Sequence, residues 1–306
     1  MAIPTTRTKV EAQITINHEK CSACGLCVSV CKSFCLKIDN KQLKKTNNSI
    51  FGCIGCGHCM AICPNDAIKI NGREISPQEM INIPPKENTA NYEQFLNLMY
   101  RRRSIREFQD REVDEHIIQK ILEAAQTSPM GLPPSDVNVL VICGKKKVNC
   151  FAKDYSEYLK SLRFLSSKFF LAIMRPFWGK ENDEIFKSFI NPLFSTYIDE
   201  FKKGNNFITY DAPLAMYFYG TPYSDPADPI VAATYAMLAG ESLGLGTCML
   251  GGIHPFIIGG SKAKKFREKH QINYKSKEGL FVIFGYSKVK YQKTIKRSFA
   301  SINFFK

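Results

Sequence analysis

The chain has 306 residues, 44% of them hydrophobic, and a formal net charge of +14, a composition that predicts a globular protein of two domains. A membrane span needs about 20 consecutive apolar residues, whereas the apolar run at 169–174 ends after six, so we expect no membrane-spanning helix. Residues 1–20 contain no apolar segment of the secretory type, which predicts a reducing, cytoplasmic location.

Residues 12–16 alternate in polarity and predict an edge strand that leads into a cysteine-rich segment. Within that segment the spacing C-x2-C-x2-C-x3-C occurs twice, with an offset of 32 residues. Gly25 repeats as Gly57 at the same offset, and strand-like stretches follow at 36–38 and 68–70. Such repetition is typical of a duplicated small unit. The eight cysteines of the two runs are Cys21, Cys24, Cys27, Cys31, Cys53, Cys56, Cys59 and Cys63.

Two other uses of cysteine fit this segment less well. A zinc ribbon needs only four ligands, and disulfides suit short secreted scaffolds. The segment instead resembles a bacterial ferredoxin with two 4Fe–4S clusters, in which the fourth cysteine of each run ligates the other cluster. The resemblance implies one cluster on Cys21, Cys24, Cys27 and Cys63, and a second on Cys53, Cys56, Cys59 and Cys31.

Two features depart from the repeat. Lys32 follows Cys31 in the first run, whereas a proline, Pro64, follows Cys63 in the second. Cys35 is a ninth cysteine and could compete with Cys31 as a ligand. We expect Cys31 to be the ligand because only Cys31 preserves the repeat, and we interpret Cys35 as a small buried residue beside the cluster.

The segments between and after the two runs are predicted to lie at the surface. Residues 41–48 are polar and basic, which predicts a surface turn or extension. Prolines at positions 77, 84 and 85 stiffen the chain and prevent a helix. We therefore predict a ferredoxin domain over 1–75, a linker over 76–90 and a second domain over 91–306.

The second domain opens with a predicted helix over 91–101, followed by Arg-Arg-Ser-x-Arg at 102–106. A helix with an aspartate N-cap is predicted over 115–127, because its apolar residues recur at the spacing of a core-facing stripe. A Ser-Pro-rich loop at 128–134 ends that helix, and residues 137–142 predict a buried strand.

This order resembles the N-terminal part of the FMN-dependent nitroreductase family. A basic cluster on its own is usually a solvated face, but here the resemblance implies that it binds the FMN phosphate, since guanidinium groups form charge-assisted, often bidentate hydrogen bonds with phosphate. The resemblance also implies flavin contacts from the backbone of Met130 and Gly131. Many relatives have an asparagine and an aromatic residue where Pro133 and Val137 stand. The implied phosphate ligands are Arg102, Arg103, Ser104 and Arg106.

Residues 150–210 are rich in aromatic side chains at helical spacing, interrupted by prolines at 176 and 192. They predict either a helical hairpin packed on the core, or a lid that shapes the substrate pocket and excludes water from the flavin. The remaining cysteines, Cys143, Cys150 and Cys248, show no ligand spacing and are interpreted as structural thiols.

Strands are predicted at 214–219 and 280–285, and a small-residue helix at 230–243. The Gly-Leu-Gly that follows the helix would on its own indicate a tight turn, but it is similar to a nitroreductase segment beside the isoalloxazine ring. The similarity implies that the backbone at Leu250, Gly251 and Gly252 approaches flavin N5, where glycine leaves room. Relatives supply a second phosphate contact from the basic segment after 285. The candidates for that contact are Arg297 and, more weakly, Lys293 and Lys296.

Together these segments imply an α+β fold: a ferredoxin-like two-cluster domain followed by a nitroreductase-type mixed sheet flanked by helices. The family is usually a homodimer with FMN at the subunit interface. The implied function is an iron–sulfur flavoprotein oxidoreductase with two 4Fe–4S clusters and FMN. It would pass electrons from ferredoxin-type carriers or NAD(P)H to nitroaromatics, quinones or similar small acceptors. No Gly-x-Gly-x-x-Gly follows a strand, in agreement with the lack of a separate dinucleotide-binding domain.

Three alternatives remain open at this point. One is a ferredoxin-linked flavin reductase of a halogenated or unsaturated metabolite, and another is a pure electron carrier. The third, from a different class, is a basic iron–sulfur nucleic-acid-binding protein. Two clusters and an FMN phosphate would lower the net charge to about +8, and the lysines are scattered. The residual charge predicts a solvated surface or an acidic redox partner steered by the field.

Overall fold

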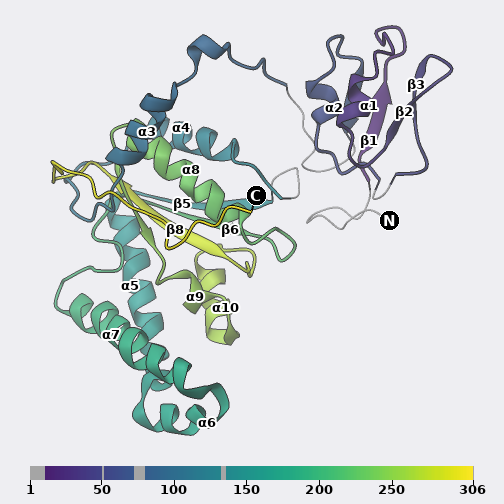
Figure 1. The fold of residues 1–306 in the computed structure, drawn as a ribbon. Helices are drawn as coiled ribbons and strands as arrows, with labels where there is room; N and C mark the ends of the chain where they lie inside the picture. Colours follow the sequence, from purple (N-terminus) through teal and green to yellow (C-terminus); the bar gives the residue numbers. More distant parts are fainter. Residues whose placement is uncertain (1–10, 50–51, 72–79, 132–135, 306) are drawn as a thin grey trace.

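In a computed structural model, residues 11–49, 52–71, 80–131 and 136–305 are described. Figure 1 shows a small unit that contains both cysteine runs and a larger unit built around a four-stranded sheet. None of the helices within these ranges is both long and apolar enough to cross a membrane.

The small unit repeats one pattern twice, as the cysteine runs predict. Its elements are β1 (Gln13–Ile16), α1 (Leu26–Val30), β2 (Leu36–Asp39), β3 (Gln42–Lys45), α2 (His58–Ala61) and β4 (Ile68–Asn71). Each helix begins after a glycine in the left-handed region, with φ of 80° at Gly25 and 75° at Gly57, a conformation that glycine adopts without steric cost. β1 pairs antiparallel with β4, and β2 pairs antiparallel with β3.

The prediction of a turn or extension over 41–48 is wrong for its first half, because β3 occupies it. Asn40 and Lys41 both have left-handed φ, 48° and 60°, which is the conformation of a two-residue hairpin turn whose twist matches the flanking strands. Leu43 is buried in the small core between the two sheets. The burial of Leu43 therefore accounts for a strand in this otherwise basic stretch.

The larger unit has one sheet in the order β5-β6-β8-β7, and its named strands all pair antiparallel. The strands are β5 (Val137–Cys143), β6 (Leu214–Gly220), β7 (Gly246–Leu250) and β8 (Gly279–Gly285). β6 and β8 are buried along their whole length. β5 is only half-buried, contrary to the prediction of a buried strand, because it lies at the edge of the sheet.

Helices cover both faces of this sheet (Figure 1). One face packs against α4 (Glu115–Gln126) and α8 (Asp228–Ser242). The other packs against α5 (Lys145–Ser161), α9 (His254–Ile257) and α10 (Gly260–Lys269). Small residues of α8, among them Ala233, Ala236 and Gly240, let it approach the sheet closely; a Cβ on Gly240 would lie 3.0 Å from the Thr247 side chain.

Of the N-cap residues of the two helices α3 and α4, only that of α3 makes a capping hydrogen bond. α3 (Tyr92–Arg101) begins with a capping box, in which the Asn91 side chain accepts from the Gln94 backbone and the Gln94 side chain accepts from the Asn91 backbone. Asp114 is the N-cap of α4 by position, but its side chain makes no capping hydrogen bond. Both helices match the predicted ranges to within one residue at each end.

Residues 150–202 are largely helical, as predicted, whereas 203–210 form turns. After α5 come η2 (Arg163–Ser166), α6 (Lys168–Ile185), η3 (Phe186–Ile190), α7 (Asn191–Phe194) and η4 (Ser195–Glu200). Pro176 lies inside α6, but the kink falls at Gly179, whose φ is 75°. The end of the segment packs on the core through Tyr197 and Ile198, whereas Phe169 and Phe177 of α6 are exposed. The hairpin interpretation therefore holds for the α7–η4 part.

Candidate functional site

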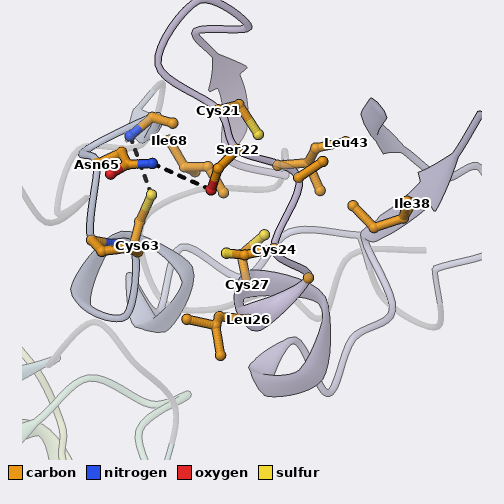
Figure 2. A pocket seen from close by; sticks show the side chains of 14 residues that line it. Cys21, Ser22, Cys24, Leu26, Cys27, Ile38, Leu43, Cys63, Asn65 and Ile68 are labelled. Atoms are coloured by element: carbon orange, nitrogen blue, oxygen red, sulfur yellow. Dashed lines mark hydrogen bonds between the residues drawn. The ribbon is translucent and has the colours of Figure 1, made fainter. Parts of the chain in front are cut away.

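The eight cysteines of the two runs line two separate cavities. The first cavity is lined by Cys21, Cys24 and Cys27 of the first run and by Cys63 of the second. Figure 2 shows Cys63, which follows α2, across this cavity from Cys24 and Cys27. The second cavity is lined by the reciprocal set, Cys53, Cys56, Cys59 and Cys31, and also by Cys35, which belongs to neither run. Each cavity thus collects three thiols from one run and one from the other.

The fourth cysteine of each run has the same surroundings. The backbone N–H of Ala67 donates to Cys63 Sγ at 3.3 Å, and that of Cys35 donates to Cys31 Sγ at 3.3 Å. Cys35 therefore occupies the position of Ala67 in the repeat, and Cys31 occupies that of Cys63. Burial, followed by the neighbouring thiols of Cys31 and Cys53, raises the pKa of Cys35 to about 12.

The donor set of each cavity suits a 4Fe–4S cluster, which four cysteine thiolates hold. Burial raises the pKa of Cys27, and it raises the pKa of Cys59 to about 12 with neighbouring thiols contributing. Bound iron reverses this preference, because a metal deprotonates its thiol ligands. Among the described residues no three such side chains meet closely enough to hold a single metal ion; in a four-iron cluster each thiolate binds a different iron atom.

The Arg-Arg-Ser-x-Arg segment runs beside β7. Ser104 forms a parallel bridge with Thr247, and the Ile105 N–H donates to the Thr247 carbonyl at 2.9 Å. This parallel contact makes the antiparallel sheet a mixed one. Side chains alternate along an extended segment, so successive residues of the motif lie on opposite sides.

Three of the four predicted phosphate ligands gather on one side. Arg106, Ser104 and Arg102 all lie close enough to Cys248 to lower its pKa, although burial outweighs them and raises it. Arg103 lies on the other side. It donates through Nη1 to the Arg102 carbonyl at 2.7 Å and lines a neighbouring cavity with Lys290 and Lys293.

Arg102 has an environment that suits an anion. Burial, with help from Arg297 and Arg103, lowers the pKa of its guanidinium. Its Nη1 is buried without a hydrogen-bond partner in the described part of the chain. A buried unpaired cation beside two others is costly, and a doubly charged phosphate would neutralise it with charge-assisted hydrogen bonds. Arg102, Ser104, Arg106 and Arg297 therefore fit the phosphate of FMN.

The glycines after β7 differ in their surroundings. A Cβ on Gly251 would meet nothing within 4 Å, whereas one on Gly252 would lie 3.0 Å from the Tyr197 hydroxyl oxygen. The Gly252 carbonyl accepts from the Tyr155 hydroxyl at 2.7 Å, and Leu250 is buried. The open backbone at Gly251 is the part that a flat ring can approach.

Two tyrosines from the helical segment also reach this region. Burial, then Tyr210 and Cys248, raises the pKa of Tyr197 to about 12, while Arg106 acts in the opposite direction. The Arg106 guanidinium lies over the Tyr210 ring at 5.6 Å from its centroid. The helical spacing around Tyr197 indicated only an apolar face, and no sequence pattern pointed to Tyr210.

The loop at 128–131 lies elsewhere. The Gly131 N–H donates to Asp228 at 2.8 Å, at the first turn of α8, and Met130 packs on the same core. Arg101, next to the arginine cluster, pairs with Glu241 in the last turn of α8 at 3.5 Å. Thirteen residues of helix separate these ends by about 20 Å. Pro133 lies outside the described residues.

Comparison with known families shows which family the chain matches. A model described as the nitroreductase family matches residues 99–286, well over half of the chain. The chain belongs to the nitroreductase family. A 4Fe-4S binding domain matches residues 14–37 and 52–69 of this nitroreductase-family protein, which places one match on each cysteine run. Among curated proteins, no sequence matches it.

Solved structures of nitroreductases resemble the larger unit. A nitroreductase with bound FMN from Desulfitobacterium hafniense DCB-2 has a TM-score of 0.50 and 19% identity, covering 69% of this chain and 98% of its own. A nitroreductase with bound FMN from Bacteroides fragilis NCTC 9343 has a TM-score of 0.49 and 16% identity, covering 70% of this chain and 100% of its own. At these identities the first structure supports the shared fold.

Proposed function

We propose that this nitroreductase-family protein is an FMN-dependent iron–sulfur oxidoreductase that links one-electron carriers to the two-electron reduction of small molecules. FMN exchanges electrons singly or in pairs, whereas a 4Fe–4S cluster carries one at a time. The observation that supports this most directly is the half-buried Arg102 beside Arg297, whose Nη1 is buried without a hydrogen-bond partner in the described residues, in a chain that also collects two sets of four cysteines.

Different residues of the chain bind different parts of FMN. Arg102, Ser104, Arg106 and Arg297 hold the phosphate, and the open backbone at Gly251 leaves room for the ring. Tyr197 and Tyr210 close the other side of this region. Since the loop at Gly131 is about 20 Å away along α8, it serves the site of a second copy in a homodimer, as the family resemblance implies.

The electron donors are a reduced ferredoxin or flavodoxin at the clusters, or NAD(P)H at the flavin. The acceptors are nitroaromatics, quinones or similar small molecules in a reducing compartment such as the cytoplasm. Within this proposal the ferredoxin domain spans 1–75, the linker 76–90 and the flavin domain 91–306. A halogenated or unsaturated metabolite as acceptor is the second candidate.

Anaerobic purification followed by iron, sulfide and flavin analysis tests the proposal. We expect about eight iron atoms and one FMN per chain. Cys53→Ala should lose about four iron atoms and slow ferredoxin-driven turnover far more than NAD(P)H-driven turnover. A preparation that cannot be reconstituted with FMN would sink the proposal. Equal loss with both donors, in a folded variant that keeps its FMN, would contradict separate entry points.

A further inference from the structure

The two cluster cavities can be compared residue by residue because the small unit is a repeat. β2 and β3 form one sheet, and Ile38 and Leu43 from this sheet line the first cavity. β1 and β4 form the equivalent sheet, and Ile14 and Ile70 line the second cavity. Any difference between the two sheets therefore distinguishes the two clusters.

Two residues that line the first cavity are more exposed than their equivalents at the second. Ile38 is 39% exposed, whereas Ile70, at the equivalent position, is 3% exposed. Cys24 is exposed, whereas its equivalent Cys56 is half-buried. Less of the protein therefore covers the first cavity at Ile38 and Cys24, and an external protein could approach a cluster there from the side of Ile38 on β2.

The two sheets also differ in charge. The β2–β3 hairpin carries four lysines, while the β1–β4 sheet carries only Lys69. Asp39 is the single acidic residue of the hairpin and pairs with Lys44 at 2.9 Å. The four lysines, which we call the basic hairpin, are Lys37, Lys41, Lys44 and Lys45.

The lysines of the basic hairpin are not all placed where they would stabilise the fold. Lys37 lies directly opposite Lys44 in the strand register, and like charges directly opposite each other destabilise an antiparallel pair. Lys37, Lys41 and Lys45 are exposed and have no ion-pair partner in the part of the chain described. The lysines lie beside two exposed apolar side chains, Leu26 and Ile38. A charged rim around an apolar centre is typical of a docking surface.

We propose that the basic hairpin docks an acidic one-electron carrier protein, of the ferredoxin or flavodoxin class, over the first cavity. The inference rests on the proposed function, because it assumes that both cavities hold clusters. The docked carrier loses one electron and the cluster held by Cys21, Cys24, Cys27 and Cys63 gains it, with no bond formed and no proton moved. Lysines on the surface accelerate such an encounter by steering a partner of opposite charge.

The repeat supplies a matched pair of variants for the test. Lys37 and Lys69 occupy equivalent positions on β2 and β4, and both are exposed. Lys37→Glu places an acid opposite Lys44 and so removes a repulsion, but it also removes the attraction between Lys37 and Asp39. The two effects oppose each other, so we expect little change in folding. Lys69→Glu changes the net charge by the same amount on the other sheet. Each holoenzyme is mixed with a reduced acidic ferredoxin in an anaerobic stopped-flow instrument, and cluster and flavin absorbance are followed separately.

We expect Lys37→Glu to lower the second-order rate constant of cluster reduction by about tenfold at low ionic strength, with the difference fading as salt is added. Lys69→Glu should stay within about twofold of the unsubstituted protein, and reduction of both by dithionite should be unchanged. Equal loss in both variants would show that only net charge matters and would overturn the proposal. So would a Lys37→Glu defect confined to flavin reduction, which would place the hairpin against the chain's own flavin domain.

The same traces separate this inference from the proposed function. Clusters that accept electrons from the carrier without reducing the flavin would leave the docking surface standing and overturn the proposed function. Clusters that respond to dithionite but not to the carrier, while NAD(P)H still reduces the flavin, would overturn the docking surface alone.

Discussion

At the scale of single residues, Arg102 indicates an anion-binding site more clearly than any other residue discussed. Its guanidinium is half-buried, and Arg297 and Arg103 lie near enough to lower its pKa. A buried charge is costly unless it is paired, and here Glu241 and Cys248 offset only part of the effect of burial and the other arginines. The alternation of the extended segment explains why Arg103 lines a cavity that its sequence neighbour Arg102 does not line.

Arg102→Gln should therefore weaken FMN binding and leave the flavin-free protein equally stable or more stable. Hydrogen bonds to charged groups contribute about 1.5–3 kcal/mol, which corresponds to about a 10- to 100-fold rise in the FMN dissociation constant. Titration followed by flavin fluorescence measures the first effect, and thermal unfolding of the flavin-free protein measures the second.

The control is Arg101→Gln, one residue earlier, whose side chain is 78% exposed and pairs at 3.5 Å with the mostly buried Glu241. This variant should bind FMN within about twofold of the unsubstituted protein, because the Arg101 guanidinium lies largely in solvent. A drop in stability of the flavin-free Arg102→Gln protein would show that the guanidinium is already satisfied within the fold.

At the scale of elements, the position of the arginine segment depends on its packing against β7. Ile105 lies directly against Gly246, where a Cβ would come 2.6 Å from Ile105 Cγ1. The glycine of the Gly-Leu-Gly motif is thus needed for a close approach between two segments more than 130 residues apart. That approach brings Ser104 and Arg106 beside Cys248.

Gly246→Ala should destabilise the larger unit, because overpacking a tight core contact costs about 1–3 kcal/mol. For a domain of about 200 residues this lowers the melting temperature by about 2–10 °C. Gly259→Ala is the control, since a Cβ there would meet nothing within 4 Å. Calorimetry that shows equal melting temperatures for both variants would mean that the Ile105 contact relaxes freely.

At the scale of the whole molecule, the two halves of the predicted flavin site lie at opposite ends of α8 on one chain. The arginine cluster is near Glu241, and the loop with Gly131 is tied to Asp228. A site that needs both halves is completed when a second copy contributes one of them. The homodimer that the family resemblance implies would bring the two halves of the site together in this way.

Mixed dimers test this arrangement. Arg102→Gln impairs the arginine half, and Gly131→Val disturbs the loop half, since a Cβ at Gly131 would already lie 2.9 Å from Asp225. If each site uses both chains, a mixed dimer has one site with both defects and one with neither. We expect tight FMN binding at about half stoichiometry in isolated mixed dimers, measured by flavin analysis. Monomeric protein in sedimentation that still binds FMN would contradict the shared site.

Much of the fold and of the candidate site could be predicted from the sequence. The cysteine runs, the helices at α3, α4 and α8 and the strands at β6 and β8 follow from spacing and periodicity. The edge position of β5 and the hairpin strand β3 could not be foreseen, because burial depends on which strands pair. Tyr197 and Tyr210 could not be assigned to the site from the sequence, because their neighbours Cys248 and Arg106 come from distant segments.

By itself, the sequence determined the cysteine spacing, the basic motif and the glycine-rich stretch, because each depends on residues close together in the chain. The tertiary structure decided how they combine. It brought Cys63 to the first run and Cys31 to the second, separated Arg102 from Arg103, and set Gly252 under Tyr197. These outcomes depend on packing between distant segments, whose geometry no local pattern specifies.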